Sequence, residues 1–471
     1  MKHLEVVSIG SNKGAPRIWI EGRKALAGGF TPGSRYTAKV DPEKCLLTLE
    51  QCDQGMRIVS KKTKGDKEFP VIDLNSQQLL SIFDGLDSVR VVIQQNRICI
   101  LPVASELRAR RRLHRLRDRV QKHEPLEFAS AASGIGILDM AAHEGFALAG
   151  LETKLKLAVE IRDDCMEHAA EVNPVYSAET VTVTMPMQEF AFDNWAVSQV
   201  GEHDVLCIGV PCSGASIAGR SKRGLEHPES HPDVGHMIVP VLALVARLNP
   251  VAFCVECVIP YRQTASMAVM RSMLRDLGYT VHETELHASE WSMLEHRNRF
   301  CMVAVTNGIE FSFDDIKKPE LRQRRFGEIM DEVDPNHSTW GKIDYIWAKY
   351  RRDLEAGKGF APTVVDADTE KLPVLNKTLH KRQSTGTYIQ HPLDPELFRI
   401  PTIREHARAK GVPEVLVQGT TQTFGHEILG QAISVPPFVA VFELLAKALR
   451  AFGESSKEVT QAITRGNAVA A

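Results

Sequence analysis

From Leu126 onward, short apolar runs alternate with longer stretches of helical periodicity, and this alternation restricts the possible fold more than any other feature. Parallel strands need crossover connections, and helical crossovers cover both faces of the sheet. The predicted strands are residues 126–130, 155–161, 181–183, 205–211, 251–258, 279–286 and 299–305, and the predicted helices are residues 138–148, 163–173, 234–248 and 265–277. The pattern predicts an α/β fold with a Rossmann-like, doubly wound parallel sheet.

One predicted strand ends at a cysteine among small residues. The apolar run that follows Asp204 breaks at Pro211, and Cys212 comes next, before serine, glycine and alanine. In open parallel sheets, binding and catalytic groups gather just beyond the carboxyl ends of the strands, which makes Cys212 a candidate nucleophile. A structural cysteine in a turn is the alternative, and this stretch alone favours it.

A glycine pair follows the first strand of this region. Gly134 and Gly136 enclose Ile135 and allow the backbone to turn tightly against a ligand. Glu160 ends the second strand, where an acidic side chain accepts hydrogen bonds from a ribose in dinucleotide sites. The chain completes no GxGxxG and has no Walker lysine here, so the pattern favours an adenosyl cofactor without a pyrophosphate.

Further charged residues follow near the same predicted sheet edge. Glu256 lies in an apolar run, at the end of the strand after that of Cys212, and a carboxyl in such a run is costly unless it is paired or functional. Arg297 and Arg299 lie two residues apart and would share one face of an extended segment. Paired arginines can hold a phosphate or the edge of a base.

These motifs and two near the end of the chain resemble those of the DNA cytosine-C5 methyltransferase family. Gly209-Val-Pro-Cys212-Ser is similar to its nucleophile motif, Glu256 to the glutamate of ENV, and Glu295-x-Arg297-x-Arg299 to QxRxR. Arg399 to Arg408 resembles the RxLTxREAAR stretch, and Gly430 to Pro437 resembles GNxVPP before a final helix at 438–449. The motifs occur in the family's order.

The resemblance implies both an activity and a set of site residues. S-adenosylmethionine would donate a methyl group to C5 of a flipped cytosine in double-stranded DNA, through a covalent adduct with Cys212. Glu256 would act at N3 of the base, and Arg297 would reach the substrate more readily than Arg299. Residues 216–232 would form a closing loop. The implied cofactor-binding residues are Gly134, Ile135, Gly136, Glu160, Ile161, Pro211 and Gln431.

The chain departs from the family pattern mainly near the cofactor. Ala132 replaces an aromatic residue, the segment around Thr182 lacks an acidic one, and Cys257, Glu295 and Gln431 replace an asparagine, a glutamine and an asparagine. Two alternatives therefore stay open: an RNA (tRNA) cytosine-C5 methyltransferase, and a DNA-binding regulator with a weakened methyltransferase fold. The leading hypothesis admits a cognate restriction endonuclease as a partner.

The first hundred residues contain an internal repeat. An offset of 52 residues carries Gly33 onto Gly85 and Leu49 onto Leu101, and each copy reads as strand, short helix, turn and hairpin. The first copy resembles the AbrB-like swapped-hairpin fold, especially its SymE-like branch, which implies a DNA-binding module. A β-rich domain used only for folding or dimer contacts is the alternative. An arginine-rich amphipathic helix follows, suited to phosphate contacts or to a solvated linker.

These features divide the chain into six predicted segments. They are a repeat domain (1–104), a basic linker helix (105–124), a catalytic domain (125–306), a target-recognition region (307–398), a return to the catalytic domain (399–452) and a tail (453–471). The nine cysteines are scattered and show no zinc spacing, and no apolar run reaches membrane-spanning length. We therefore expect a cytoplasmic protein without a metal site. The net charge of −2 argues against a uniformly basic surface.

Overall fold

The computed structural model describes residues 1–359 and 361–455, which form two compact units. The first contains Met1–His114 and Asp276–Gly278, and the second contains Arg115–Arg275 and Tyr279–Ser455. The division falls within helix α3 (Ala104–Lys122), ten residues after the predicted start of the linker helix. Of the predicted tail, Gly453 and Glu454 belong to the last helix, and residues 456–471 lie outside the described residues.

The first unit has the predicted repeated order of elements. Its strands are β1 (His3–Ser8), β2 (Gly10–Asn12), β3 (Ala15–Glu21), β4 (Arg35–Asp41), β5 (Leu46–Gln51), β6 (Arg57–Ile58), β7 (Ser60–Lys64), β8 (Lys67–Asn75), β9 (Ser88–Gln94) and β10 (Arg97–Pro102). Its helices are α1 (Arg23–Ala27), α2 (Gln77–Leu80) and the 3-10 turn Ser81–Phe83. The repeat predicted the central hairpins β4–β5 and β9–β10, whereas β1, β2, β6 and β7 lie outside it.

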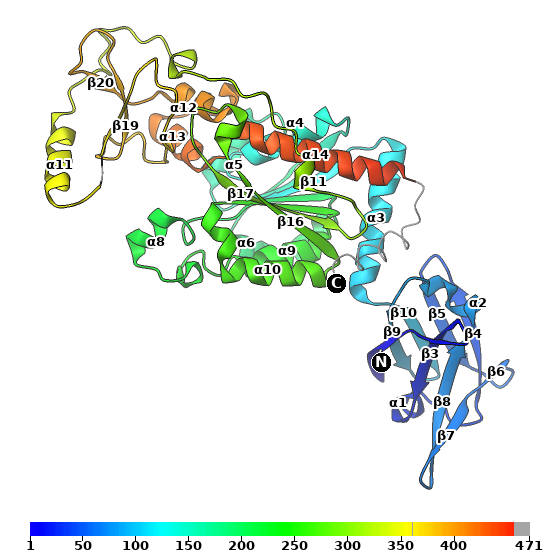
Figure 1. Cartoon of the computed structure of the whole chain (residues 1–471). Coiled ribbons are helices and arrows are strands. Elements are labelled where there is room, and N and C mark those ends of the chain that lie inside the picture. Colours follow the sequence, from blue (N-terminus) through cyan, green and yellow to red (C-terminus); the bar gives the residue numbers. More distant parts are fainter. Residues whose placement is uncertain (360, 456–471) are drawn as a thin grey trace. The chain divides into compact units, whose positions relative to one another are not determined.

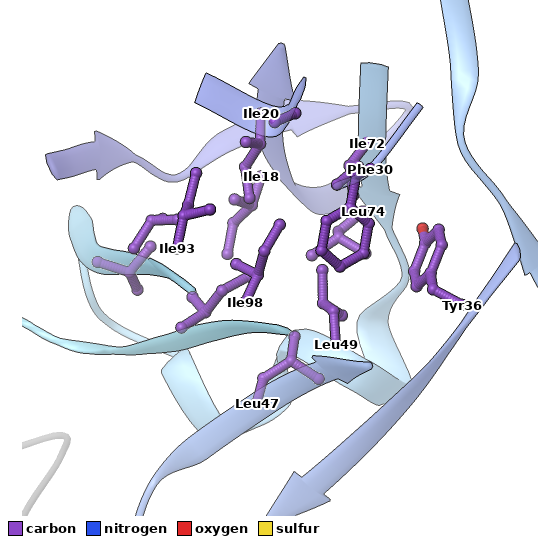
Figure 2. Close-up of a cluster of buried hydrophobic side chains, with 14 of the residues drawn as sticks. Ile18, Ile20, Phe30, Tyr36, Leu47, Leu49, Ile72, Leu74, Ile93 and Ile98 are labelled. Atoms are coloured by element: carbon purple, nitrogen blue, oxygen red, sulfur yellow. The ribbon is translucent and has the colours of Figure 1, made fainter. Parts of the chain in front are cut away.

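Equivalent strands of the two copies pair with each other. β3 pairs antiparallel with β8 in a four-stranded sheet, and β5 pairs antiparallel with β10 in a six-stranded one. Gly33 and Gly85, which the repeat aligns, both have positive φ, at 84° and 80°. Figure 2 shows that apolar side chains of both copies meet in one core, among them Ile18, Leu49 and Ile98. The AbrB-like resemblance stays a prediction.

Helix α3 uses its arginines differently from the prediction. Leu113, Leu116 and Val120 are buried, as the amphipathic pattern predicts. Within the second unit, however, Arg115 and Arg119 both pair with the fully buried carboxylate of Asp204 at 2.8 and 3.0 Å. These arginines neutralise an internal charge and are not available as phosphate contacts, because an unpaired carboxylate at that depth would be strongly destabilising.

The second unit is built on a seven-stranded sheet of order β13-β12-β11-β14-β15-β17-β16. The strands are β11 (Leu126–Ala131), β12 (Thr153–Glu160), β13 (Val181–Thr184), β14 (Val205–Gly209), β15 (Ala252–Cys257), β16 (Tyr279–Leu286) and β17 (Arg299–Thr306). All seven were predicted, and the α/β, Rossmann-like class is confirmed. The sheet is mixed, however, because β17 runs antiparallel to both β15 and β16. A helical crossover does not separate β16 from β17, so the two strands form a hairpin.

Helices cover both faces of this sheet (Figure 1). The helices of the unit outside residues 307–398 include α4 (Ile137–Leu148), α5 (Asp163–Val172), α6 (Met187–Phe192), α7 (Asn194–Val200), α9 (Ile238–Leu248), α10 (Ala265–Asp276) and α14 (Val435–Glu454). Beside the sheet lie α8 (Ile217–Arg223), α12 (Ile403–Lys410) and α13 (Gln422–Gln431). The predicted returning helix is α14, which packs on α4. The close approach requires Gly145 of α4, where a Cβ atom would lie 2.6 Å from the carbonyl oxygen of Val439.

Residues 307–398 form a small, separate region within the second unit. It has helix α11 (Asp344–Glu355) and a sheet of β18 (Thr363–Val365), β19 (Thr387–Gln390) and β20 (Phe398–Arg399). Ile346 of α11 packs with Tyr388 and Phe398 in a local core. The remaining short 3-10 helices of the unit are Pro228–Ser230, Ile259–Gln263, Ala288–Trp291, Phe313–Asp315, Phe326–Glu328 and Glu414–Val417.

Among the described helices, α13 and α14 together have the length and apolar composition of a membrane span, although no single helix does. The pair is bent by 46°. Phe438, Phe442 and Leu445 of α14 are buried within the unit, which explains the apolar composition of that helix.

Candidate active site

A cavity of about 410 Å³ opens at the carboxyl ends of the parallel strands. The strand order reverses between β11 and β14, which is where ligands bind in open α/β sheets. Of the eleven predicted site residues, nine line this cavity: Gly134, Ile135, Glu160, Ile161, Pro211, Cys212, Glu256, Arg299 and Gln431. Gly136 and Arg297 are not among its lining residues. Segments separated by up to about three hundred residues of chain thus meet at one recess.

The glycine-rich turn after β11 forms one wall. Gly134 and Gly136 have φ of 56° and 74°, and Ala132 has φ of 49°. A Cβ atom at Gly136 would lie 2.6 Å from Nδ2 of Asn173 and 2.7 Å from Tyr176, so that glycine serves the packing behind the turn. Gly134 has open space around the corresponding position. The two glycines therefore have different roles, and Gly134 is the one that faces the cavity.

Glu160 joins the ends of β11 and β12. Its Oε2 accepts a hydrogen bond from the backbone N–H of Gly134 at 2.8 Å. Its Oε1 accepts from the backbone N–H groups of Ile161 and Arg162, both at 3.0 Å. A carboxylate with two oxygens has lone pairs left for a ligand hydroxyl. Glu160 is thus held in a fixed position at the cavity wall by the backbone around it.

Cys212 lies in a turn immediately beyond β14, and its side chain is exposed in the cavity. Its carbonyl oxygen accepts hydrogen bonds from the backbone N–H groups of Ala215 and Ser216, which fixes the turn. Desolvation in the recess and the neighbouring Glu256 raise the pKa of the Cys212 thiol, whereas Arg299 and Arg297 lower it. The balance keeps the thiol protonated until a ligand or a base changes its surroundings.

Glu256 and Arg299 form an ion pair beside the thiol. β14 and β15 are parallel neighbours with Gly209 opposite Glu256, which places the carboxyl next to the turn of Cys212. Arg299 Nε lies 2.8 Å from Glu256 Oε1, and both side chains are 12% exposed. Burial raises the pKa of Glu256, and the two nearby arginines oppose that rise. A carboxyl with a raised pKa can donate a proton nearer to neutral pH.

Arg297 lies behind the cavity wall. It is 4% exposed, and its Nη2 donates a hydrogen bond to the carbonyl oxygen of Gly430 at 3.1 Å. Burial and the charge of Arg299 lower its pKa to about 10, so it is still cationic at neutral pH. The expectation that Arg297 lies closer to the substrate than Arg299 does not fit this arrangement. Side-chain alternation predicted a shared face, but the segment before β17 is not a regular strand.

Sequence reasoning missed the residues after β13. Four of them line the cavity: Met185, Pro186, Met187 and Gln188. From the sequence, only the lack of an acidic residue around Thr182 was noticeable here. Met185 is 36% exposed and Ile161 is 64% exposed, although both are large and apolar. The detectable signal was their position directly after the third strand of a doubly wound sheet.

The departures from the family pattern fall in different places. Ala132 and Gln431 line the cavity, and Thr182 is not among its lining residues. Cys257 is buried, and its thiol donates to the carbonyl oxygen of Val210 at 3.5 Å, just before the turn of Cys212. Glu295 is also fully buried and pairs with Lys410. The predicted closing loop, residues 216–232, contains helix α8.

Comparison with known proteins identifies the family. A model described as C-5 cytosine-specific DNA methylase matches residues 126–447. Type II methyltransferase M.MspI of Moraxella sp is 29% identical over 265 residues, which cover 55% of this chain and 60% of that protein. Type II methyltransferase M1.ScrFI of Lactococcus lactis subsp. cremoris is 25% identical, and the alignment covers 53% of this chain and 64% of that protein. The chain thus matches less than two thirds of the length of these relatives.

Solved structures share the fold. The Dnmt2 methyltransferase of S. pombe superposes with a TM-score of 0.53 and 18% identity, covering 68% of this chain and 98% of that one. The methyltransferase EhMeth of Entamoeba histolytica gives 0.52 and 15%, covering 69% and 98%. The family predicted from the motifs is confirmed by the match over residues 126–447. The chain belongs to the C-5 cytosine-specific DNA methylase family.

Proposed function

We propose that the protein methylates C5 of cytosine in double-stranded DNA with S-adenosylmethionine as the methyl donor. The single observation that carries this proposal is the meeting of Cys212, Glu256 and Arg299 in one cavity with the glycine-rich turn and Glu160. The first group suits addition to a pyrimidine ring, and the second suits an adenosyl ligand. One cavity holding both brings a methyl donor and its acceptor together.

The cofactor end of the cavity fits an adenosyl group. Ile161 and Met185 present exposed apolar surface that a ring system would cover. Glu160 has a fixed carboxylate for ribose hydroxyls, and Gly134 allows close approach of the backbone. When bound there, S-adenosylmethionine would supply an electrophilic methyl group. We propose Gly134, Ile135, Glu160, Ile161, Pro211 and Gln431 as the residues that hold it, with Gly136 supporting the turn.

The reaction end fits the chemistry of cytosine. The Cys212 thiolate adds to C6 of the ring, and its electron pair moves through the ring to C5, which becomes nucleophilic. Glu256 donates a proton to N3, and Arg299 orients the Glu256 carboxyl through their ion pair. After methylation, Glu256 takes back the N3 proton and a base removes the proton from C5. The C5–H electron pair forms the C5=C6 bond, the C6–S bond breaks, and Cys212 leaves as the thiolate with the aromatic ring restored.

The cytosine must leave the duplex to reach Cys212, because a stacked base hides its C5 and C6 from a recessed thiol. We propose that residues 307–398 contact the DNA and that residues 216–232 close over the flipped base. The relatives are Type II methyltransferases, which supports a restriction–modification setting and a cognate endonuclease as a partner. The AbrB-like repeat of residues 1–104 would add a second DNA contact.

DNA is favoured over the two alternatives. The matching family model and the curated relatives are DNA methylases or Type II methyltransferases, which supports DNA rather than RNA as the substrate. A regulator with a weakened fold would have no use for an exposed thiol beside a paired carboxyl, yet both are present. Neither alternative is supported by an observation of its own.

Covalent trapping tests the proposal. The protein is incubated with S-adenosylmethionine and a mixed pool of duplexes carrying 5-fluorocytosine, in which loss of the C5 substituent is blocked. We expect a denaturation-resistant adduct that Cys212→Ala abolishes. Single-stranded and hairpin RNA carrying 5-fluorocytosine serve as the comparison. An adduct on RNA alone would replace DNA by RNA as the substrate, and DNA binding without any adduct or methyl transfer would favour the regulator.

A further inference from the structure

A fully buried ion pair joins Glu295, two residues before Arg297 in the chain, to Lys410 of helix α12. Lys410 Nζ lies 2.7 Å from Glu295 Oε1 and 2.5 Å from Oε2, and both side chains are 0% exposed. Glu295 Oε1 also accepts a hydrogen bond from the backbone N–H of Leu375 at 3.0 Å. Burying two charges costs several kcal/mol per ion, and their attraction offsets this cost only when the geometry is good. Such a pair contributes little net stability, which points to another role.

The pair joins three segments that are distant in sequence. Glu295 lies just before β17, Leu375 follows β18, and Lys410 ends α12. Backbone hydrogen bonds fix the first two together, because Leu372 N donates to Leu294 O at 2.8 Å and His296 N donates to Leu372 O at 3.2 Å. The segment that carries both arginines is therefore held at Glu295, two residues before Arg297.

Arg297 is the nearest competitor of Lys410 for this carboxylate. Arg297 Nη1 lies 3.9 Å from Glu295 Oε1, at the limit of an ion pair, whereas Lys410 is in direct contact. Arg297 instead donates to the carbonyl oxygen of Gly430, the residue before Gln431 in the cavity wall. Its Nε has no hydrogen-bond partner among the described residues. Lys410 thus pairs with the Glu295 carboxylate, which would otherwise attract the Arg297 guanidinium away from Gly430.

We propose that Lys410 is a positioning residue: by neutralising Glu295 it keeps the Arg297 guanidinium bonded to the carbonyl oxygen of Gly430, beside the cavity wall, instead of to Glu295. The sequence gives an independent reason, because Glu295 stands where the family pattern has an uncharged glutamine. A glutamine needs no counter-ion, so the glutamate and Lys410 act as a matched pair in this chain. The expected effect of Lys410 on methyl transfer rests on the proposed function. Its expected effect on the reactivity of the Cys212 thiol does not.

The first test measures the thiol directly and needs no DNA. The full chain is alkylated with iodoacetamide across a pH series, and the Cys212 peptide is quantified by mass spectrometry. Burial and the charge of Arg297 lower the pKa of Lys410 to about 7, so the comparison is made at pH 6, where Lys410 is charged. Arg297 lowers the pKa of Cys212, so Lys410→Met, which leaves Glu295 to capture Arg297, is expected to slow alkylation at this pH by about threefold. The neutral double variant Glu295→Gln/Lys410→Met is expected to restore the rate to within about twofold.

Two controls separate positioning from folding and from charge alone. Arg399 and Glu405 form an equally buried pair at 2.7 Å, so Arg399→Met measures the general effect of breaking such a pair. In an Arg297→Ala background, Lys410→Met is expected to cause no further slowing. Unchanged alkylation in Lys410→Met, equal slowing in Arg399→Met, or full slowing without Arg297 would each overturn the proposal.

Methyl transfer provides the second readout. Lys410→Met is expected to lower kcat about 100-fold with KM for S-adenosylmethionine changed less than about threefold, and the double variant is expected to recover most of kcat. A wild-type protein that shows the alkylation pattern but methylates no DNA would contradict the proposed function and leave the positioning role supported. A KM change without a kcat change would overturn the catalytic part of this inference.

Discussion

The two ends of the cavity are lined by different kinds of chemical group. At the reaction end, a thiol, a carboxyl and an arginine lie in a desolvated wall, with Arg299 and Glu256 in contact at 2.8 Å. At the cofactor end, the wall consists of backbone N–H groups held by Glu160 and of apolar side chains such as Ile161 and Met185. The reaction end therefore depends on individual functional groups, whereas the cofactor end relies on contacts shared among many groups.

This contrast explains which departures from the family pattern the site tolerates. In the proposed mechanism, Cys212, Glu256 and Arg299 each have a role that a different side chain would not fill. Apolar contacts are individually small and can be exchanged, so a change such as Ala132 at the cofactor end need not remove the site. The comparison predicts large, specific losses at the reaction end and small, graded ones at the cofactor end.

The largest effect is expected from Cys212→Ser. A serine hydroxyl is a far weaker nucleophile than a thiolate, so methyl transfer should fall by at least about 10³-fold. The affinity for S-adenosylmethionine should change less than about twofold, because the cofactor contacts lie on the other wall. Radiolabelled methyl transfer and isothermal titration calorimetry measure the two quantities. Cys207→Ser, at a buried cysteine of β14, is the matched control. Retained transfer in Cys212→Ser would remove the thiol from the mechanism.

Glu256→Gln is expected to cost about 10²–10³-fold in kcat, since an amide cannot donate the proton to N3 and leaves Arg299 without its partner. The wild-type rate should fall as the pH rises through the raised pKa of Glu256, because the protonated form is the donor. A single-turnover pH profile with a duplex substrate tests both statements. Glu285→Gln, at a partly exposed carboxyl of β16 that pairs with Arg262, should leave the rate and its profile unchanged. A Glu256→Gln enzyme with the wild-type profile would assign the proton transfer to another group.

The sequence predicted most residues of both ends of the cavity, because they end neighbouring strands or follow them directly. Cys212 and Glu256 end adjacent strands, and strand order alone brings their side chains together. Met185 and Met187 were missed although they directly follow the third strand, because apolar residues at that position also resemble an ordinary turn into a helix. The pairing of Glu295 with Lys410 was also missed, since 115 residues separate the two and no local pattern connects them. The antiparallel β17 was missed because the alternation of strands and helices had suggested uniform crossovers.

One buried carboxyl, that of Asp139, lies near the cofactor end and should make stability depend on pH. Asp139 in the first turn of α4 is 1% exposed, and neither of its carboxyl oxygens has a hydrogen-bond partner among the described residues. Burial raises its pKa to about 7 from an ordinary 3.8. Between these two values the native state holds a proton that the unfolded chain lacks, so stability is lost as the pH rises through this window.

Asp139→Asn should remove that dependence. The wild-type free energy of unfolding should fall by on the order of 3 kcal/mol between pH 4 and pH 7, and the variant should show a curve flatter by that amount. Urea unfolding at several pH values, with Asp164→Asn as an exposed control, measures the difference. Parallel curves for the wild type and Asp139→Asn would show that Asp139 stays ionised in the folded protein, with a buried cation or water that offsets its charge.

The smallest effect is expected from Ile161→Ala. Ile161 is 64% exposed in the cavity, so its truncation leaves no hole in the folded core and should barely change stability. A bound adenosyl group would cover that surface, and losing roughly half of an isoleucine contact costs about 1 kcal/mol, or about fivefold in Kd for S-adenosylmethionine. Calorimetric titration measures it, with Leu148→Ala, an exposed apolar change at the end of α4, as the control. A loss of affinity of 100-fold or more would contradict the contrast between the two ends, because it would show that the cofactor end also depends on single side chains. A fivefold loss with unchanged kcat would place Ile161 among the exchangeable contacts, and would explain how this wall tolerates Ala132 in place of the family's aromatic residue.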